Sequence, residues 1–442
     1  MDNSLDKNIS TGFLLKFAFP TVIAMVFMSI YTMVDGIFVS RLIGTDALSA
    51  VNIVMPIILT SYAIATMFGT GGNAIVAKKL GEKKDTEARI NFSTLVVVTI
   101  VISSILTVLS FIFINPLLNF LGADESIYNY TYHYAVYSLV FLPFTMFSAI
   151  FQSFFVTAGK AHLGLIFTVA GGLSNMILDY VFIKVLGIGI AGAAIATGIG
   201  YTIPGLLGFL FFIFNRKGSL YLVKPNLDLE LIKNTCINGS SEMVTNLSGS
   251  IITILMNNIL MSLAGADGVA SITVILYIQM LLTAVFMGYS MGTAPLISFN
   301  YGKQDNTRLN KIYKISLTII TVISLTVFIF GITNTNLLIS IFTGESSEVF
   351  NMAVHGFKLF SPSFIFIGIN IFSSAFFTAF SNGKVSAFIS FLRTLFFVVV
   401  FLLILPKFLG INGVWIAVPF AEILGFMVSI FYFKKYKTIY GY

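Results

Sequence analysis

The sequence predicts an all-α membrane protein with about twelve transmembrane helices, arranged as two six-helix bundles. Of the 442 residues, 57% are apolar and only 10% are charged, which is too few charges to cover a soluble domain of this length. The apolar runs are about 20–30 residues long, and a helix needs about 20 residues to cross a bilayer. In addition, the second half of the chain repeats features of the first half.

Each half of the chain contains six apolar runs, and each run is expected to form one helix. The predicted helices are 12–39, 46–77, 90–114, 131–157, 162–186, 190–214, 230–262, 267–298, 312–333, 351–380, 384–407 and 410–434. The longest polar break carries Arg216, Lys217, Lys224 and Pro225. We therefore expect an N-terminal lobe at 1–214, a cytoplasmic linker at 215–229 and a C-terminal lobe at 230–442.

The distribution of basic residues predicts the orientation of the chain. With both termini in the cytoplasm, the inner segments hold twenty of the 25 lysines and arginines. The outer segments then hold four, at Arg41, Lys184, Lys358 and Lys407, and the remaining one, Arg393, lies inside a predicted helix. Membrane topology thus accounts for the isoelectric point near 9.2, so we expect a lipid bilayer as a partner and no nucleic acid. The single cysteine, Cys236, excludes an internal disulfide.

An offset of 221 residues aligns the two halves without a gap. The matched pairs include Gly71 with Gly292, Gly81 with Gly302, Phe151 with Phe372 and Gly189 with Gly410. Because each copy has an even number of helices, both copies enter the membrane from the same side. They are then related by an axis along the membrane normal. This arrangement predicts two lobes around a central cleft, with alternating access achieved by rocking of the lobes.

Five charged residues lie well inside apolar runs: Asp35, Asp179, Glu242, Arg393 and Glu422. Ionisable groups at membrane depth are costly, so each is a candidate functional residue. The repeat partners of Asp35 and Asp179 are Met256 and Val400, so the second copy lacks both acids. The chemistry of this acid pair is therefore expected in the first lobe.

Helix geometry predicts that four polar residues of the first lobe lie at one level. Asp179 and Thr197 are each nine residues from the predicted turn near Ile188, which places both about 13 Å below it. Asp35 has a similar depth, and Asn175 is one turn from Asp179 on the same face. Their oxygen atoms suit Na⁺, whereas two close carboxylates equally suit a proton. The alternative is that these acids only join neighbouring helices by hydrogen bonds.

The remaining buried charges belong to the second copy. Glu242 is expected near mid-membrane, where it would face the central cleft and pair with a cationic substrate. Arg393 and Glu422 have roughly matching depths, which favours an ion pair, and the alternative makes Glu422 a second substrate-facing acid. Pro20 shares a helix with Asp35, so a bend at this proline would alter the acid site.

The sequence shows no pattern typical of an enzyme. It contains no Walker A motif, and no catalytic constellation is recognisable. The three histidines and Cys236 are not spaced as a metal cluster. We therefore expect a protein that is not an enzyme and has no cofactor, with Na⁺ or H⁺ as a coupling ion.

Four segments resemble the multidrug and toxic compound extrusion (MATE) family, in its prokaryotic branch. They are Tyr31–Ala50 (YTMVDGIFVSRLIGTDALSA), Gly69–Ala88 (GTGGNAIVAKKLGEKKDTEA), Met291–Gly302 (MGTAPLISFNYG) and Asn175–Thr197, which contains NMILDYVFI and GIAGAAIAT. The resemblance implies a V-shaped fold and export of cationic drugs or toxins by exchange for Na⁺ or H⁺. It also implies the cytoplasmic membrane of a bacterium, a role in antibiotic resistance and, we expect, a monomer.

The resemblance implies specific roles for several residues of this chain. It implies a cation site at Asp35, Asn175, Asp179 and Thr197, a helix-kinking proline at Pro20 and a helix 7 acid at Glu242. An acid found in helix 10 of some members has no counterpart between Phe372 and Phe380, which favours coupling through the first lobe.

Three other classes are alternatives. A flippase for lipid-linked precursors would also contain repeats, but it usually carries more helices and a cationic cleft, whereas the buried charges here are mainly acidic. A major-facilitator transporter is a second alternative, with a loop superficially like the one that follows Gly81. A receptor or channel subunit that transports nothing is the third, and it would not need an acid site confined to one lobe.

Overall fold

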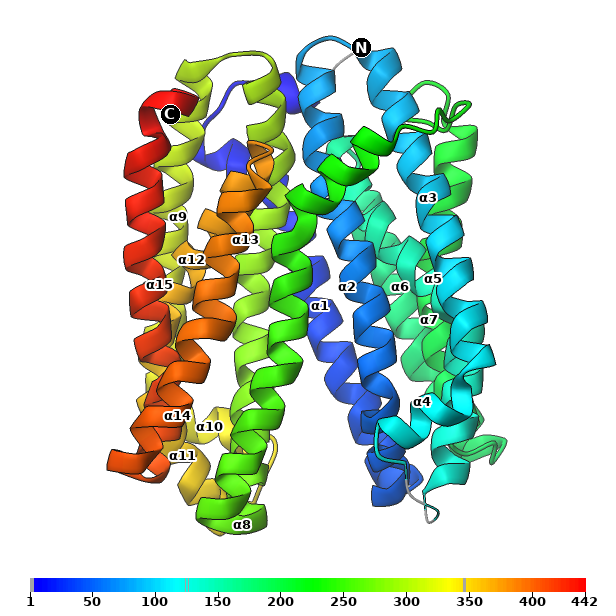
Figure 1. The fold of residues 1–442 in the computed structure, drawn as a ribbon, viewed down its shortest axis with the longest axis vertical. Coiled ribbons are helices and arrows are strands. Elements are labelled where there is room, and N and C mark those ends of the chain that lie inside the picture. Colours follow the sequence, from blue (N-terminus) through cyan, green and yellow to red (C-terminus); the bar gives the residue numbers. More distant parts are fainter. Residues whose placement is uncertain (1–3, 124, 126, 345–346) are drawn as a thin grey trace.

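The computed structural model describes residues 4–123, 125, 127–344 and 347–442, and helices dominate this part of the chain. The helices form two bundles that diverge like the arms of a V (Figure 1). Both termini lie at the end of the molecule where the arms meet (Figure 1). The predicted fold class, an all-α protein of two helical bundles, is confirmed.

The first bundle contains seven helices and one π-helical turn. They are α1 (Thr11–Leu42), α2 (Thr45–Gly81), α3 (Asp85–Ile112), α4 (Ile114–Phe120), α5 (Tyr128–Thr157), α6 (Ala161–Asp179), the π-helical turn η2 (Tyr180–Val185) and α7 (Ile190–Phe214). A short 3₁₀ turn, η1 (Ser4–Asp6), precedes them. An extended segment from residue 215 to 228 leads from α7 to the second bundle.

The second bundle begins with the longest helix of the chain. Its elements are α8 (Leu229–Gly302), α9 (Asn306–Thr333), α10 (Thr335–Ser340), α11 (Glu348–Phe360), the 3₁₀ turn η3 (Ser361–Ser363), α12 (Phe364–Ala379), α13 (Gly383–Phe391), the π-helical turn η4 (Leu392–Phe396), α14 (Phe397–Leu409) and α15 (Ile411–Tyr440).

Within the described residues, eleven helical segments are long and apolar enough to cross a membrane. The segment α8 contributes two crossings, because Gly265 (φ 63°, ψ −151°) breaks it in the middle. The total is therefore the twelve crossings that the sequence predicts, and the chain is a multi-pass membrane protein.

The repeat is visible in the backbone of equivalent turns. Gly189 and Gly410 are repeat partners, and they have φ values of 68° and 55° immediately before α7 and α15. Such positive φ values favour glycine over any residue with a side chain. The same turn geometry thus explains why glycine occupies this position in both copies.

Three predicted helices are not continuous α-helices. The predicted helices 162–186 and 384–407 each contain a π-helical turn, η2 and η4, and the predicted helix 351–380 is interrupted by η3 at Pro362. A π-helical turn accommodates one extra residue without changing the apolar character of the run, so hydropathy alone does not reveal it. Both π-helical turns adjoin charged residues, since η2 follows Asp179 and η4 contains Arg393.

The two bundles touch through glycines on α2 and α8. A methyl group added at Gly71 would overlap the carbonyl of Thr235, and one added at Gly239 would overlap the carbonyl of Met67. Gly81 approaches the carbonyl of Phe299 in the same way. The two backbones are therefore in direct contact where the arms meet, which requires residues without side chains.

The N-terminal segment is attached to the second bundle. The carboxylate of Asp6 accepts hydrogen bonds from Lys303 (2.7 Å) and Arg308 (2.6 Å), and the neighbouring Leu5 is buried. The hydrogen bond from Lys303, followed by that from Arg308, keeps the pKa of Asp6 below its usual value of 3.8. This contact joins the beginning of the chain to the turn between α8 and α9.

Candidate functional site

Helices α1, α6 and α7 bring three of the predicted site residues into one hydrogen-bonded chain. The amide nitrogen of Asn175 donates to the hydroxyl of Thr197 at 3.3 Å. That hydroxyl in turn donates to a carboxylate oxygen of Asp35 at 3.4 Å. The residues come from distant positions in the sequence, so the bundle itself creates the cluster.

Asp179 completes the first-lobe cluster. It lies one turn after Asn175 on α6, it is an electrostatic neighbour of Asp35, and it is fully buried. Neither oxygen of Asp179 has a donor among the described residues, and the side-chain oxygen of Asn175 also has none. Buried oxygens without a donor are unfavourable, so this cluster suits a bound cation or proton.

Close packing of α6 against α7 positions the cluster. A methyl group added at Gly171 would overlap the carbonyl of Gly200, and one at Gly200 would lie 2.9 Å from the Cβ atom of Asn175. The two backbones can approach only because both residues are glycine. This approach places Asn175 of α6 within hydrogen-bond reach of Thr197 on α7.

A small cavity of about 20 Å³ adjoins Thr197 and is lined by residues that the sequence analysis missed. Ser61, Ser138 and Tyr201 line it together with Thr197. Tyr201 follows Thr197 by one helical turn, so its position on the same helix face could have indicated it. No comparable sequence signal marks the two serines, which come from α2 and α5.

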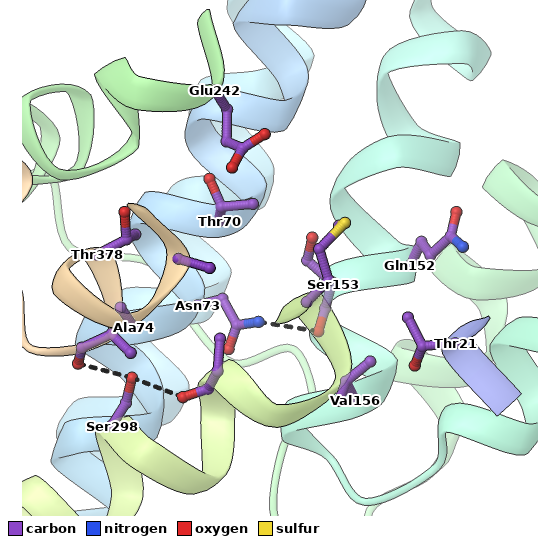
Figure 2. Close-up of a pocket in the computed structure, with 14 residues that line it drawn as sticks. Thr21, Thr70, Asn73, Ala74, Gln152, Ser153, Val156, Glu242, Ser298 and Thr378 are labelled. Atoms are coloured by element: carbon purple, nitrogen blue, oxygen red, sulfur yellow. Dashed lines mark hydrogen bonds between the residues drawn. The ribbon is translucent and has the colours of Figure 1, made fainter. Parts of the chain in front are cut away.

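A second cavity, of about 30 Å³, lies between the two lobes (Figure 2). Glu242 reaches into it from α8, and Thr70 and Asn73 contribute from α2 (Figure 2). Thr21 of α1 also lines it, and its hydroxyl is buried without a partner among the described residues. The repeat pairs Thr21 with Glu242, Thr70 with Met291 and Asn73 with Ala294, and all six residues line this cavity. The cavity therefore lies on the axis that relates the two copies.

A further cavity, of about 250 Å³, lies within the second lobe and is lined by buried charged residues. Glu242 lines this cavity as well as the cavity on the axis, so it connects the two. No described residue donates a hydrogen bond to its carboxylate. Arg393 of η4 and Glu422 of α15 also line this cavity.

Arg393 and Glu422 form the ion pair that the sequence favours. A terminal guanidinium nitrogen of Arg393 donates to one oxygen of Glu422 at 3.0 Å. The other oxygen of Glu422 accepts from Asn370 at 2.6 Å, and Ser429 donates to Asn370 at 2.9 Å. Glu422 is therefore fully hydrogen-bonded by protein. Asn370 was missed, although a lone amide in an apolar run is a signal of the same kind as a lone charge.

These observations define a two-lobed membrane transporter, with a buried acid cluster in one lobe and charged cavities on the axis and in the other lobe. The sequence profile of the MatE family matches residues 20–181 and 243–404, one segment in each half. The chain belongs to the MatE family, whose members are transporters and not enzymes.

Bacterial relatives and solved structures agree with this assignment. The "Multidrug export protein MepA" of Staphylococcus saprophyticus is 23% identical over 414 residues, covering 92% of this chain and 90% of its own. The protein of the same name from Staphylococcus haemolyticus is 23% identical over 95% of this chain and 92% of its own.

Two solved structures show the same fold. One is an outward-facing multidrug resistance MATE family transporter, with a TM-score of 0.91 and 23% identity over 97% of this chain and 96% of its own. Another is a MATE protein in the straight conformation, with a TM-score of 0.92 and 23% identity over 99% of both chains. The V-shaped arrangement of twelve helices is thus common to all three chains.

Proposed function

We propose that this transporter exports amphiphilic cationic compounds in exchange for Na⁺ or H⁺. The observation that carries the proposal is the first-lobe cluster, where the two buried oxygens of Asp179 lie beside Asp35 and have no donor in the described part of the chain. The family relatives named as multidrug export proteins support export of drug-like compounds. No other cofactor is required by this mechanism.

The orientation follows from the basic residues. The end that carries both termini also carries most of the lysines and arginines, so it faces the cytoplasm under the positive-inside rule. The arms of the V then diverge toward the outside. In a bacterium this orientation corresponds to the cytoplasmic membrane, with the chain acting as a monomer.

The coupling ion enters from outside and binds at the acid cluster. Asp35, Asn175, Asp179 and Thr197 offer two carboxylates, an amide oxygen and a hydroxyl, which suit a hard cation such as Na⁺. A proton shared by the two carboxylates satisfies the same atoms. Each elementary charge that moves inward releases about 2.3 kcal/mol per 100 mV. Because Pro20 lies on α1 with Asp35, bending of α1 links occupancy of the cluster to the position of the lobes.

The substrate charge pairs with Glu242. Its carboxylate lines both the cavity on the axis and the cavity in the second lobe, and it has no donor among the described residues. Glu422 lines the second-lobe cavity too, but Arg393 and Asn370 occupy its oxygens. Of the two acids predicted to face the substrate, Glu242 therefore has the free negative charge.

The test is ethidium efflux from proteoliposomes that contain the purified protein, driven by an imposed Na⁺ gradient or by an imposed pH gradient. Efflux driven by one gradient alone supports exchange and identifies the coupling ion. Absence of efflux under both gradients, with verified protein orientation and several cationic dyes, would contradict the proposal and favour a lipid-precursor flippase.

A further inference from the structure

The cavity within the second lobe contains a guanidinium group with spare hydrogen-bond donors. Arg393 is only 6% exposed, and Glu422 accepts from one of its terminal nitrogens. Among the described residues, no group accepts a hydrogen bond from the buried Nε atom or from the other terminal nitrogen. A buried arginine normally uses more of its five donors, so this side chain can accept a further oxygen atom as partner.

Within this ion pair, the arginine has unused hydrogen-bond donors, whereas both oxygens of the acid have a donor. Glu422 is held by Arg393 and Asn370, and Ser429 fixes Asn370 in turn. A methyl group added at Gly425 would lie 2.8 Å from the Cβ atom of Arg393, so α15 packs closely against η4. The guanidinium is therefore held in place by its neutralising partner, with its remaining donors free.

Glu242 contributes a negatively charged group to the cavity that Arg393 also lines. Its carboxylate has no donor among the described residues, and Met256, Met287, Ile367 and Val418 supply apolar surface to the cavity that both charged groups line. The cavity has a volume of about 250 Å³, which approaches the size of a typical ligand pocket. The first copy has no equivalent, because the repeat partners of Arg393 and Glu422 are Gly172 and Tyr201.

We propose that the second-lobe cavity selects compounds that carry both a positive charge and a separate carbonyl or carboxylate oxygen. The cation lies beside Glu242, the oxygen accepts hydrogen bonds from Arg393, and the flat apolar body lies against the methionines. This inference rests on the proposed function, since it names the substrate class of the same transporter. A cation without the oxygen still enters, but it leaves the donors of Arg393 without a partner.

Three dyes with one xanthylium core test the inference in detergent-solubilised protein. Tetramethylrosamine has the cation alone, tetramethylrhodamine adds a carboxylate to the phenyl ring, and its methyl ester keeps a carbonyl without the negative charge. Dissociation constants from fluorescence anisotropy should favour the carboxylate dye over the rosamine by about tenfold, the effect of one hydrogen bond to a charged group. If the ester binds like the acid, the recognised group is a carbonyl oxygen. If the ester binds like the rosamine, the recognised group is a carboxylate.

Arg393→Lys is the informative variant, because it keeps the charge beside Glu422 but removes the forked donors. We expect the preference for the carboxylate dye to fall below about threefold. The readout is a ratio measured on one preparation, so partial loss of folded protein cancels. Arg216→Lys, the same chemical change on the exposed linker, should keep the wild-type ratio.

Two results would overturn the inference: a wild-type ratio near one, or an unchanged ratio in Arg393→Lys. Failure to bind any of the three dyes would also overturn it. The proposed function is tested separately by gradient-driven ethidium efflux. A protein that exports ethidium and does not discriminate among the dyes therefore refutes only the inference about Arg393.

Discussion

Thr21 and Glu242 occupy equivalent positions in the two copies and line the same cavity between the lobes. One copy contributes a buried hydroxyl that has no partner within the described ranges, and the other contributes a carboxylate. A nearly symmetric backbone therefore carries an asymmetric set of charges at its axis. The first-lobe acids show the same asymmetry, since the positions equivalent to Asp35 and Asp179 in the second copy hold apolar residues.

Removing either first-lobe acid should abolish export. Asp35→Asn and Asp179→Asn keep the size of the side chain but remove the negative charge that a coupling ion requires. Ethidium efflux in proteoliposomes should fall to the background rate, while the thermal unfolding midpoint stays within a few degrees of wild type. Normal efflux by either variant would remove the cation site from this cluster.

Thr197 should tune the affinity for the coupling ion. Its hydroxyl links Asn175 to Asp35, and Thr197→Val removes the hydroxyl without changing the shape of the side chain. The concentration of the coupling ion that gives half-maximal efflux should rise by about tenfold, as for other residues that orient ligands. Thr197→Ser retains the hydroxyl and should behave like wild type, so equal effects of both variants would contradict this role.

The sequence predicts the helices well because crossing a bilayer imposes a length and an apolar composition on every one of them. It also indicates the charged residues, since a charge inside an apolar run is conspicuous. Helix faces are harder to predict, because lipid-facing and protein-facing surfaces are both apolar. Thr21 was missed for this reason, whereas Asn370 and Tyr201 were missed although the sequence contains a signal for each. The π-helical turns beside Asp179 and Arg393 appeared only in the structure.

Breaking the ion pair in the second lobe should destabilise the protein. Arg393→Leu leaves Glu422 buried without its counter-charge, which costs about 3–5 kcal/mol by analogy with other buried pairs. The thermal unfolding midpoint should fall clearly. The double variant Arg393→Leu/Glu422→Leu removes both charges and should recover most of the loss. If the double variant is as unstable as the single variant, packing and not charge explains the effect.

The glycines at the contact between α2 and α8 should determine how closely the two lobes approach each other at the end of the V where the arms meet. In Gly239→Ala the new methyl group meets the carbonyl of Met67, so the two helices must separate. Spin labels placed on the two lobes at that end should show a longer distance by pulsed electron resonance. Gly249→Ala is the matched control on the same helix, because a methyl group there meets no atom within 4 Å. Equal distances in both variants would show that the contact does not hold the lobes together.

Attachment of the N-terminal segment should depend on acid pH. The pKa of Asp6 is lowered by Lys303 and then by Arg308, so the stabilisation is complete above the usual value of 3.8. It is lost as the pH falls through the lowered pKa. A spin label at Asn8→Cys in a Cys236→Ser background should be immobile at neutral pH and mobile in acid. Asp6→Asn should already be mobile at neutral pH and should show no transition.

Because the coupling acids belong to one copy and the paired charges at Arg393 and Glu422 to the other, the halves are not interchangeable. A polypeptide made of two first halves would have two acid clusters and no Glu242. One made of two second halves would have no acid cluster at all. The division of labour within this duplicated chain therefore makes each half dependent on the other, as two different subunits of a heterodimer would be.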